Sequence, residues 1–155
     1  MAAALTVEVE RPDAFDVGGL IGALNEYLLS LYAPEHCHLL TADELAEPDV
    51  TFFVVREADR AVGCGALRTI GGGRGEVKRM YTAPEARSRG LGRMVLEAIE
   101  AEARRAGLSE LVLETGGEQP AALGLYASSG FVKCGPYLDY KDDGVSIFLK
   151  KSLNA

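Results

Sequence analysis

The residues with the clearest chemical potential form one short run, from Arg87 to Arg93. A strand-like segment (76–82) precedes this run, and an amphipathic helix (91–106) follows it. A glycine-containing loop that opens a helix presents free backbone N–H groups at the positive end of the helix dipole. Three arginines in the same loop indicate that the bound anion is a phosphate. The residues of the run are Arg87, Ser88, Arg89, Gly90, Leu91, Gly92 and Arg93.

Two other phosphate-binding patterns do not fit the chain. The sequence contains no G-x-x-x-x-G-K-[ST], so a P-loop nucleotidase is not indicated. The glycine-rich run from Gly71 to Gly75 fails G-x-G-x-x-G, because Glu76 stands at the last glycine position. A strand follows this run instead of a helix, which predicts a β-hairpin turn.

Composition predicts an ordinary globular protein with one domain spanning residues 1–155. The chain is 48% hydrophobic and 25% charged. No apolar run approaches the ~20 residues that cross a membrane, and the start has no basic signal-peptide region. The cysteines (Cys37, Cys64 and Cys134) are odd in number and widely spaced. These features predict a cytoplasmic protein with reduced thiols and no membrane partner.

Charge is distributed unevenly along the chain. The formal net charge is −7, which argues against general nucleic-acid binding. Residues 74–93 carry +4, so the rest of the chain carries −11. A local positive field suits a polyanionic cofactor, although a chance cluster of solvated arginines would look the same. The acidic remainder favours a cationic molecule as a second ligand or simply aids solubility.

Hydrophobic periodicity predicts a mixed α/β protein with helices on both faces of a mixed sheet. Gly63 and Gly65 weaken the prediction of the strand at 61–70. Asp13 or Asp16 could cap the first helix, and Thr41 to Glu44 form a capping box for a short second helix. The predicted strands are 5–10, 50–56, 61–70, 76–82, 111–113, 131–133 and 145–150. The predicted helices are 13–31, a short one from Thr41, 91–106 and 119–128.

Four segments in order resemble the GNAT family of N-acetyltransferases. They are Glu76–Thr82, Arg87–Gly92, Leu111–Gly116 and Ala122–Phe131. The resemblance covers most of the chain and is best from 76 to 131. It implies the acyl-CoA acyltransferase fold, in which a mostly antiparallel sheet contains one splayed parallel strand pair and is flanked by helices.

The resemblance also implies a donor and a reaction. It makes the Arg87–Arg93 loop the pyrophosphate site of acetyl-CoA, used as a co-substrate, with no metal. The segment from Met80 through Tyr81 to Thr82 would lie along the cofactor, with backbone N–H groups polarising the thioester carbonyl. The acetyl group would pass directly to a primary amine of an unidentified small molecule or peptide.

Acid and base candidates follow from the same resemblance. Tyr126 matches the tyrosine placed beside the CoA sulfur, so it is the candidate general acid; a core tyrosine is the alternative. Glu76 is the candidate general base, acting through a water; a solvent-facing glutamate that balances Lys78 or Arg79 is the alternative. Asp139, Glu26 and Glu35 are weaker base candidates.

Three further features carry less specific expectations. Many family members have an asparagine after the strand at 111–113; this chain has none, and Gln119 is a candidate substitute. The adjacent residues His36, Cys37 and His38 lack a second ligand cluster nearby in the sequence, so no metal site is expected. The tyrosines at 27, 32 and 137 could line an acceptor pocket or pack in the core.

Two other functions remain open from the sequence. A non-catalytic acyl-CoA-binding regulator would keep the arginine loop without needing Tyr126 or Glu76. A nucleotide-binding α/β protein would bind ATP in preference to acetyl-CoA. The family resemblance is also compatible with a homodimer.

Overall fold

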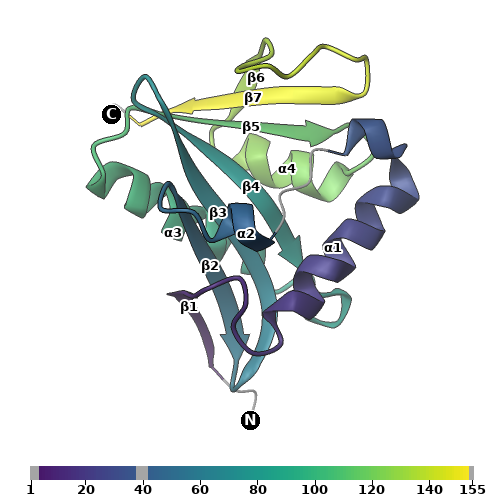
Figure 1. Ribbon diagram of the computed structural model, residues 1–155, viewed down its shortest axis with the longest axis vertical. Coiled ribbons are helices and arrows are strands. Elements are labelled where there is room, and N and C mark those ends of the chain that lie inside the picture. The colour runs from purple at the N-terminus through teal and green to yellow at the C-terminus, as the bar shows by residue number, and fades with distance from the viewer. Residues whose placement is uncertain (1–3, 38–41, 154–155) are drawn as a thin grey trace.

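The computed structural model describes residues 4–37 and 42–153. Its strands form one sheet in the order β1-β2-β3-β4-β5-β7-β6 (Figure 1). Every neighbouring pair is antiparallel except β4 and β5, which run parallel. The strands are β1 (Leu5–Val9), β2 (Val50–Glu57), β3 (Arg60–Gly71), β4 (Arg74–Thr82), β5 (Glu110–Gly116), β6 (Val132–Cys134) and β7 (Ser146–Ser152). The helices are α1 (Val17–Leu31), α2 (Ala42–Leu45), α3 (Leu91–Arg105) and α4 (Pro120–Ser128).

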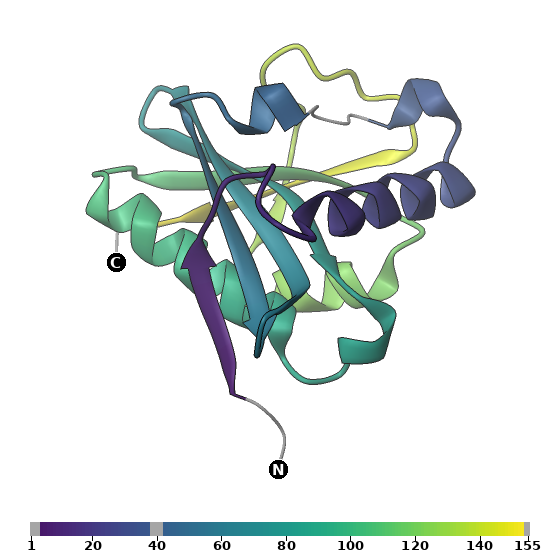
Figure 2. The same cartoon turned by 60° about the horizontal axis from the view of Figure 1, so that its bottom comes forward.

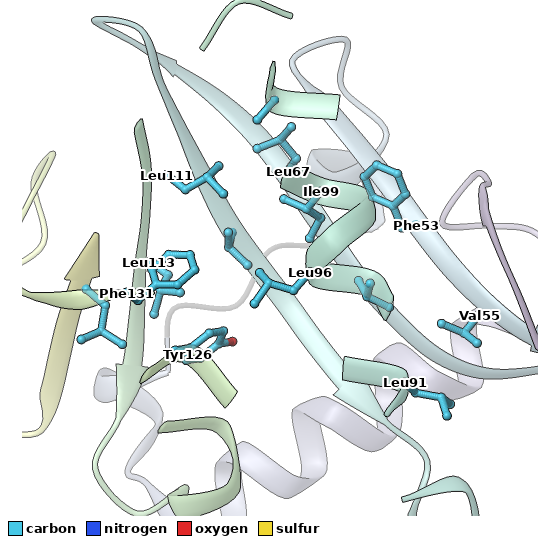
Figure 3. Close-up of a cluster of buried hydrophobic side chains, with 14 of the residues drawn as sticks. Phe53, Val55, Leu67, Leu91, Leu96, Ile99, Leu111, Leu113, Tyr126 and Phe131 are labelled. Atoms are coloured by element: carbon cyan, nitrogen blue, oxygen red, sulfur yellow. The ribbon is translucent and has the colours of Figure 1, made fainter. Parts of the chain in front are cut away.

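Helices cover both faces of the sheet, as the sequence predicts. Strand β2 shows why, because its buried residues alternate between two cores. Phe53 and Val55 pack with α3 and with Tyr126 of α4, whereas Phe52 and Val54 pack with α1 and α2. Figure 2 shows α1 and α2 (purple and blue) on one face and α3 and α4 (green) on the other. Figure 3 shows the first of these cores around Leu96 and Ile99.

A β-bulge interrupts the pairing of β3 with β4. Cys64 pairs with Tyr81 and Ala66 pairs with Lys78, so one residue of β3 faces two of β4. One of those two, Arg79, has a positive φ of 58°, a conformation that strains a residue with a side chain. The residue opposite the bulge is Gly65, where an added Cβ would lie 2.5 Å from the Sδ of Met80. The glycine thus lets the bulge and α3 approach the strand.

The parallel pair of β4 and β5 is short. It consists of three residue pairs, the last being Glu76 with Val112, after which the strands diverge. Figure 1 shows the widening gap, with α1 on one side of it and α4 on the other. Beyond Glu76, β4 is paired along the β3 edge alone, so the backbone groups on its other edge are available to a ligand.

Some local expectations need correction. Gly63 and Gly65, which weakened the prediction of a strand at 61–70, lie inside a continuous β3, so that strand is confirmed. Asp16 occupies the N-cap position of α1 but makes no side-chain cap; its carboxylate binds Arg56 and the N–H of Ala61 instead. A 3₁₀ helix at Pro34–His36 was not expected. The capping-box residue Thr41 lies outside the described residues.

We predict that Gly65→Ala destabilises the fold. The new methyl group would also lie 2.5 Å from Cγ1 of Val95, and overpacking of this kind costs about 1–3 kcal/mol. The matched control is Gly22→Ala in α1, where a Cβ meets nothing within 4 Å and helix propensity favours alanine by about 1 kcal/mol. Denaturant unfolding of both variants measures the difference; equal stabilities would contradict the packing role of Gly65.

Candidate active site

A cavity of about 100 Å³ lies where β4 and β5 separate. Both strands contribute to its wall, and α1 and α4 close it from the two faces of the sheet. The lining residues include Leu24, Leu28, Tyr32, His36, Cys37, Val77, Lys78, Arg79, Met80, Glu114, Thr115, Gly116, Gln119, Ala122, Tyr126 and Val145.

A second, wider pocket of about 530 Å³ adjoins the first. The two pockets share Tyr32, His36 and Val145. The second pocket extends between the end of α1, the turn at 117–118 and the segment 144–147. The wider pocket therefore lies next to the cavity between the strands at these three residues.

Tyr126 lies in the wall of the cavity and is 5% exposed. Its ring packs edge-on against Phe131, with the ring centroids 5.7 Å apart, and its hydroxyl points away from Phe131 (Figure 3). Burial raises the pKa of the phenol, and the negative charge of Glu114 raises it further. The group therefore stays protonated across the neutral range and is available as a proton donor.

Glu76 lies next to the cavity but is not among the residues that line it. The side chain is fully buried and accepts hydrogen bonds from the hydroxyls of Tyr137 (2.6 Å) and Tyr140 (2.8 Å). Lys78, which does line the cavity, donates to the hydroxyl of Tyr140 at 2.7 Å. The alternative of a solvent-facing glutamate that balances Lys78 is wrong about exposure, because Glu76 is enclosed, but Lys78 does lie 3.8 Å from it. Tyr140 and Lys78 connect it to the cavity.

Glu114 is a cavity residue that the sequence analysis did not single out. It lies on β5 beyond the last pair with β4, and its charge acts on Tyr126, Lys78 and Cys37. A glutamate following three buried residues of a short strand is a weak signal that could have identified it. The weaker base candidates Glu26, Glu35 and Asp139 are exposed and lie outside the cavity wall.

The backbone of the arginine loop has the form of an anion site. Ser88 (φ 65°) and Gly90 (φ 79°) are both left-handed, which turns successive N–H groups toward one side. Gly90 occupies the N-cap position of α3, and no side chain caps that helix. A Cβ at Gly90 would meet nothing within 4 Å, so the backbone there is open to a ligand. Leu91 contributes its N–H alone, because its side chain is buried in the core.

The three arginines of this loop differ in their partners. Arg89 forms an ion pair with Glu57 at 2.6 Å, which offsets its charge. Arg93 donates to the hydroxyl of Ser128 at 2.7 Å. Arg87 donates to the carbonyl of Thr82 at 3.2 Å and stacks near the rings of Tyr27 and Tyr81. The partners of Arg87 and Arg93 in these contacts are neutral, so those two arginines retain their positive charge for an anion.

The β4 residues expected along the cofactor lie between the loop and the cavity. Met80 lines the cavity, Tyr81 packs near Arg87, and Thr82 ends the strand before the loop. The free edge of β4 therefore runs between the arginine loop and the cavity that Tyr126 lines. This path suits an extended chain with amide groups.

Tyr32 fixes α1 against the end of β5. Its hydroxyl accepts hydrogen bonds from the N–H of Glu118 (3.0 Å) and from Nε2 of Gln119 (3.4 Å). A Cβ at Gly116 would overlap the Tyr32 ring, so only glycine allows this contact. Gln119 thus lies in the cavity wall, but its amide nitrogen donates to the hydroxyls of Tyr32 and Thr115.

The His36 side chain supports the wall of the cavity. Its Nδ1 lies 2.7 Å from a carboxylate oxygen of Asp143, whose pKa is lowered by the backbone N–H groups of Ser146 and Val145 and by His36. His38 lies outside the described residues. Within 4–37 and 42–153, no group of three or more His, Cys, Asp or Glu side chains is arranged to hold a metal.

No helix in the described part of the chain is long and apolar enough to cross a membrane.

Comparisons with known proteins agree with this geometry. A protein of Azospirillum brasilense named IAA acetyltransferase is 46% identical over 150 residues, covering 96% of this chain and 98% of its own. The uncharacterized N-acetyltransferase YsnE of Bacillus subtilis is 37% identical over 140 residues, covering 86% and 92%.

Solved structures agree as well. A Klebsiella pneumoniae protein named as an acyl-CoA N-acyltransferase superposes with a TM-score of 0.81 at 33% identity, covering 96% of this chain and 97% of its own. The PaiA N-acetyltransferase of Thermoplasma acidophilum, solved with coenzyme A, shares the fold with a TM-score of 0.72 at 18% identity. The match covers 95% of this chain and 99% of that one. The model of the acetyltransferase (GNAT) family matches residues 21–131, and the chain belongs to that family.

Proposed function

We propose that this protein moves an acetyl group from acetyl-CoA directly to the primary amine of a small molecule or peptide. The protein is an acyltransferase by family; the acceptor and the roles of individual residues are the proposal. The observation that supports it best is the cavity between β4 and β5, which Tyr126 lines. The unpaired edge of β4 lies between this cavity and the uncapped start of α3. A thiol-release assay with acetyl-CoA and pooled amines, peptides and aminoglycosides tests it. Tight binding of CoA without turnover of any amine would favour the non-catalytic regulator.

The donor side of the site is built mainly from backbone. The N–H groups that open α3 would hold the pyrophosphate, and Arg87 and Arg93 would add charge. The free edge of β4 from Met80 to Thr82 would pair with the pantetheine amides, and its N–H groups would stabilise the carbonyl oxygen as it gains negative charge. Acetyl-CoA supplies an activated thioester that an amine can attack.

Proton transfer is assigned to the polar groups around the cavity. Tyr126 would donate its proton toward the departing sulfur. Glu114 lines the cavity and can accept a proton from the amine directly. Glu76 can do so through Tyr140 and Lys78, which connect it to the cavity by hydrogen bonds of 2.8 and 2.7 Å. In this scheme the acid, Tyr126, is on α4, and the candidate bases, Glu114 and Glu76, are on the strands.

We predict that Gly90→Ala weakens acetyl-CoA binding at least tenfold. An alanine at a φ of 79° is strained by about 1–2 kcal/mol, and its methyl group would stand where the phosphates approach. Gly107→Ala, at the other end of α3, is the matched control, because Gly107 has a φ of 78° and a Cβ there also meets nothing within 4 Å. Calorimetry should find affinity lost in the first variant alone; equal losses would contradict the anion site.

We predict that Tyr126→Phe lowers kcat by about 10²–10⁴-fold, the usual contribution of a general acid. Because the raised pKa keeps the phenol protonated, the wild-type rate should not fall between pH 7 and 10 through loss of this proton. Thiol release with a good acceptor, measured at neutral and alkaline pH, checks both statements. Unchanged turnover in the variant, with unchanged acetyl-CoA affinity, would remove Tyr126 from the mechanism.

A further inference from the structure

The wall of the cavity carries more positive than negative charge. Lys78 and Arg79 contribute two cations, and Glu114 is the carboxylate among the residues that line it. His36 lies against Asp143, a carboxylate that is not among the residues lining this cavity. The acetyl thioester and the pantetheine arm are neutral, so nothing on the donor side would offset the extra cation.

Glu76 does not supply the missing negative charge. Besides the two tyrosine hydroxyls, it has Arg68 at 3.6 Å and Lys78 at 3.8 Å. One buried carboxylate is thus shared by two cations. If Glu76 is assigned to Arg68, then Glu114 is the carboxylate left among the residues that line the cavity, and its charge acts on Lys78.

Arg79 has no carboxylate within 4.0 Å in the described part of the chain. It is 6% exposed, and its Nη2 contacts the side-chain oxygen of Asn25 and the carbonyl of Ile21. Its Nε is buried without any hydrogen-bond partner. A buried cation with neutral partners and one unused donor is costly, and a nearby anion would reduce that cost.

Lys78 experiences the same surplus. Burial lowers the pKa of its ammonium group, and the positive charges of Arg68 and Arg79 lower it further, against the opposing effect of Glu76 and Glu114. An anion entering the cavity would stabilise the charged form. Lys78 is therefore suited to bind a negative group on the acceptor.

We propose that the acceptor is a small amine that also bears a carboxylate, of which a free α-amino acid is the simplest case. The carboxylate would lie beside Lys78 and Arg79, and the amine toward Glu114. The small cavity admits the amine and carboxylate, while the adjoining pocket of about 530 Å³ receives the remainder of the molecule. This assignment rests on the proposed function and makes its acceptor specific. It opposes the cationic acceptor that net charge alone favours.

The transfer itself is balanced within the proposed function. The C–N bond forms as the C–S bond breaks. The ammonium group of the acceptor loses two protons, of which one is returned to the sulfur and one is released to solvent. The carboxylate takes no part in bond making and acts by binding alone.

The test compares each standard amino acid with its carboxamide, using acetyl-CoA and thiol release. The amide removes the negative charge while keeping size and amine. We expect kcat/KM to be tenfold to a hundredfold higher for the preferred amino acid than for its amide, the range of a charge-assisted hydrogen bond. Amides that react equally well or better would overturn the inference and leave the proposed function intact. No turnover of either set, nor of simple amines, would contradict both.

Variants of Lys78 test whether this residue binds the carboxylate of the acceptor. Lys78→Met should abolish the preference for the acid over the amide, and Lys78→Arg should restore most of it. Replacing Lys78 also breaks its connection to Glu76, and that loss would slow the amino acid and its amide equally. The ratio of kcat/KM for the acid to kcat/KM for the amide therefore reports carboxylate binding alone. The exposed Lys150 on β7, absent from both pockets, gives the control Lys150→Met. A preference retained in a folded Lys78→Met, with normal acetyl-CoA affinity, would contradict the assignment.

Discussion

The site depends on the separation of β4 and β5 after three residue pairs. A parallel pair that continued would satisfy its backbone groups internally and leave no room between the strands. Once the strands diverge, the N–H and C=O groups on the inner edge of β4 need other partners, and a ligand with amides can provide them. The same separation lets Tyr32, just after α1, and Tyr126 of α4 reach one cavity from opposite faces of the sheet.

The bulge at Arg79 sets the direction of β4 beyond the last pair with β5. It is possible because Gly65 leaves space on β3, and the strained backbone of Arg79 is compensated by its contacts with α1. Cys64 donates from Sγ to the carbonyl of Arg79 at 3.3 Å, which ties the bulge back to β3. These contacts link α1, β3 and β4 to one another at the wall of the cavity.

The sequence predicted what depends on local spacing. The arginine loop, the α3 helix and the succession of helices and strands along the chain follow from glycine positions and apolar periodicity, and the structure has them. It could not predict the surroundings of Glu76, because its partner Tyr137 is 61 residues away in the chain. Nor does any local pattern mark Arg79 as left-handed, since glycine and asparagine are the usual signals. Glu114 was missed for the same reason: its neighbours in the cavity come from α4 and β4.

The overall charge and the charge of the cavity act over different distances. A net charge of −7 influences an approaching molecule over about 8 Å in physiological salt, beyond which it is screened. Inside the cavity, screening by salt is weak, and contacts with Lys78 and Arg79 determine which group is accommodated. A molecule with both an amine and a carboxylate has no net charge to be repelled by the acidic surface, yet it presents an anion to the cationic wall. The two levels of charge are thus compatible for such an acceptor, whereas a polycation would be attracted to the surface and disfavoured in the cavity.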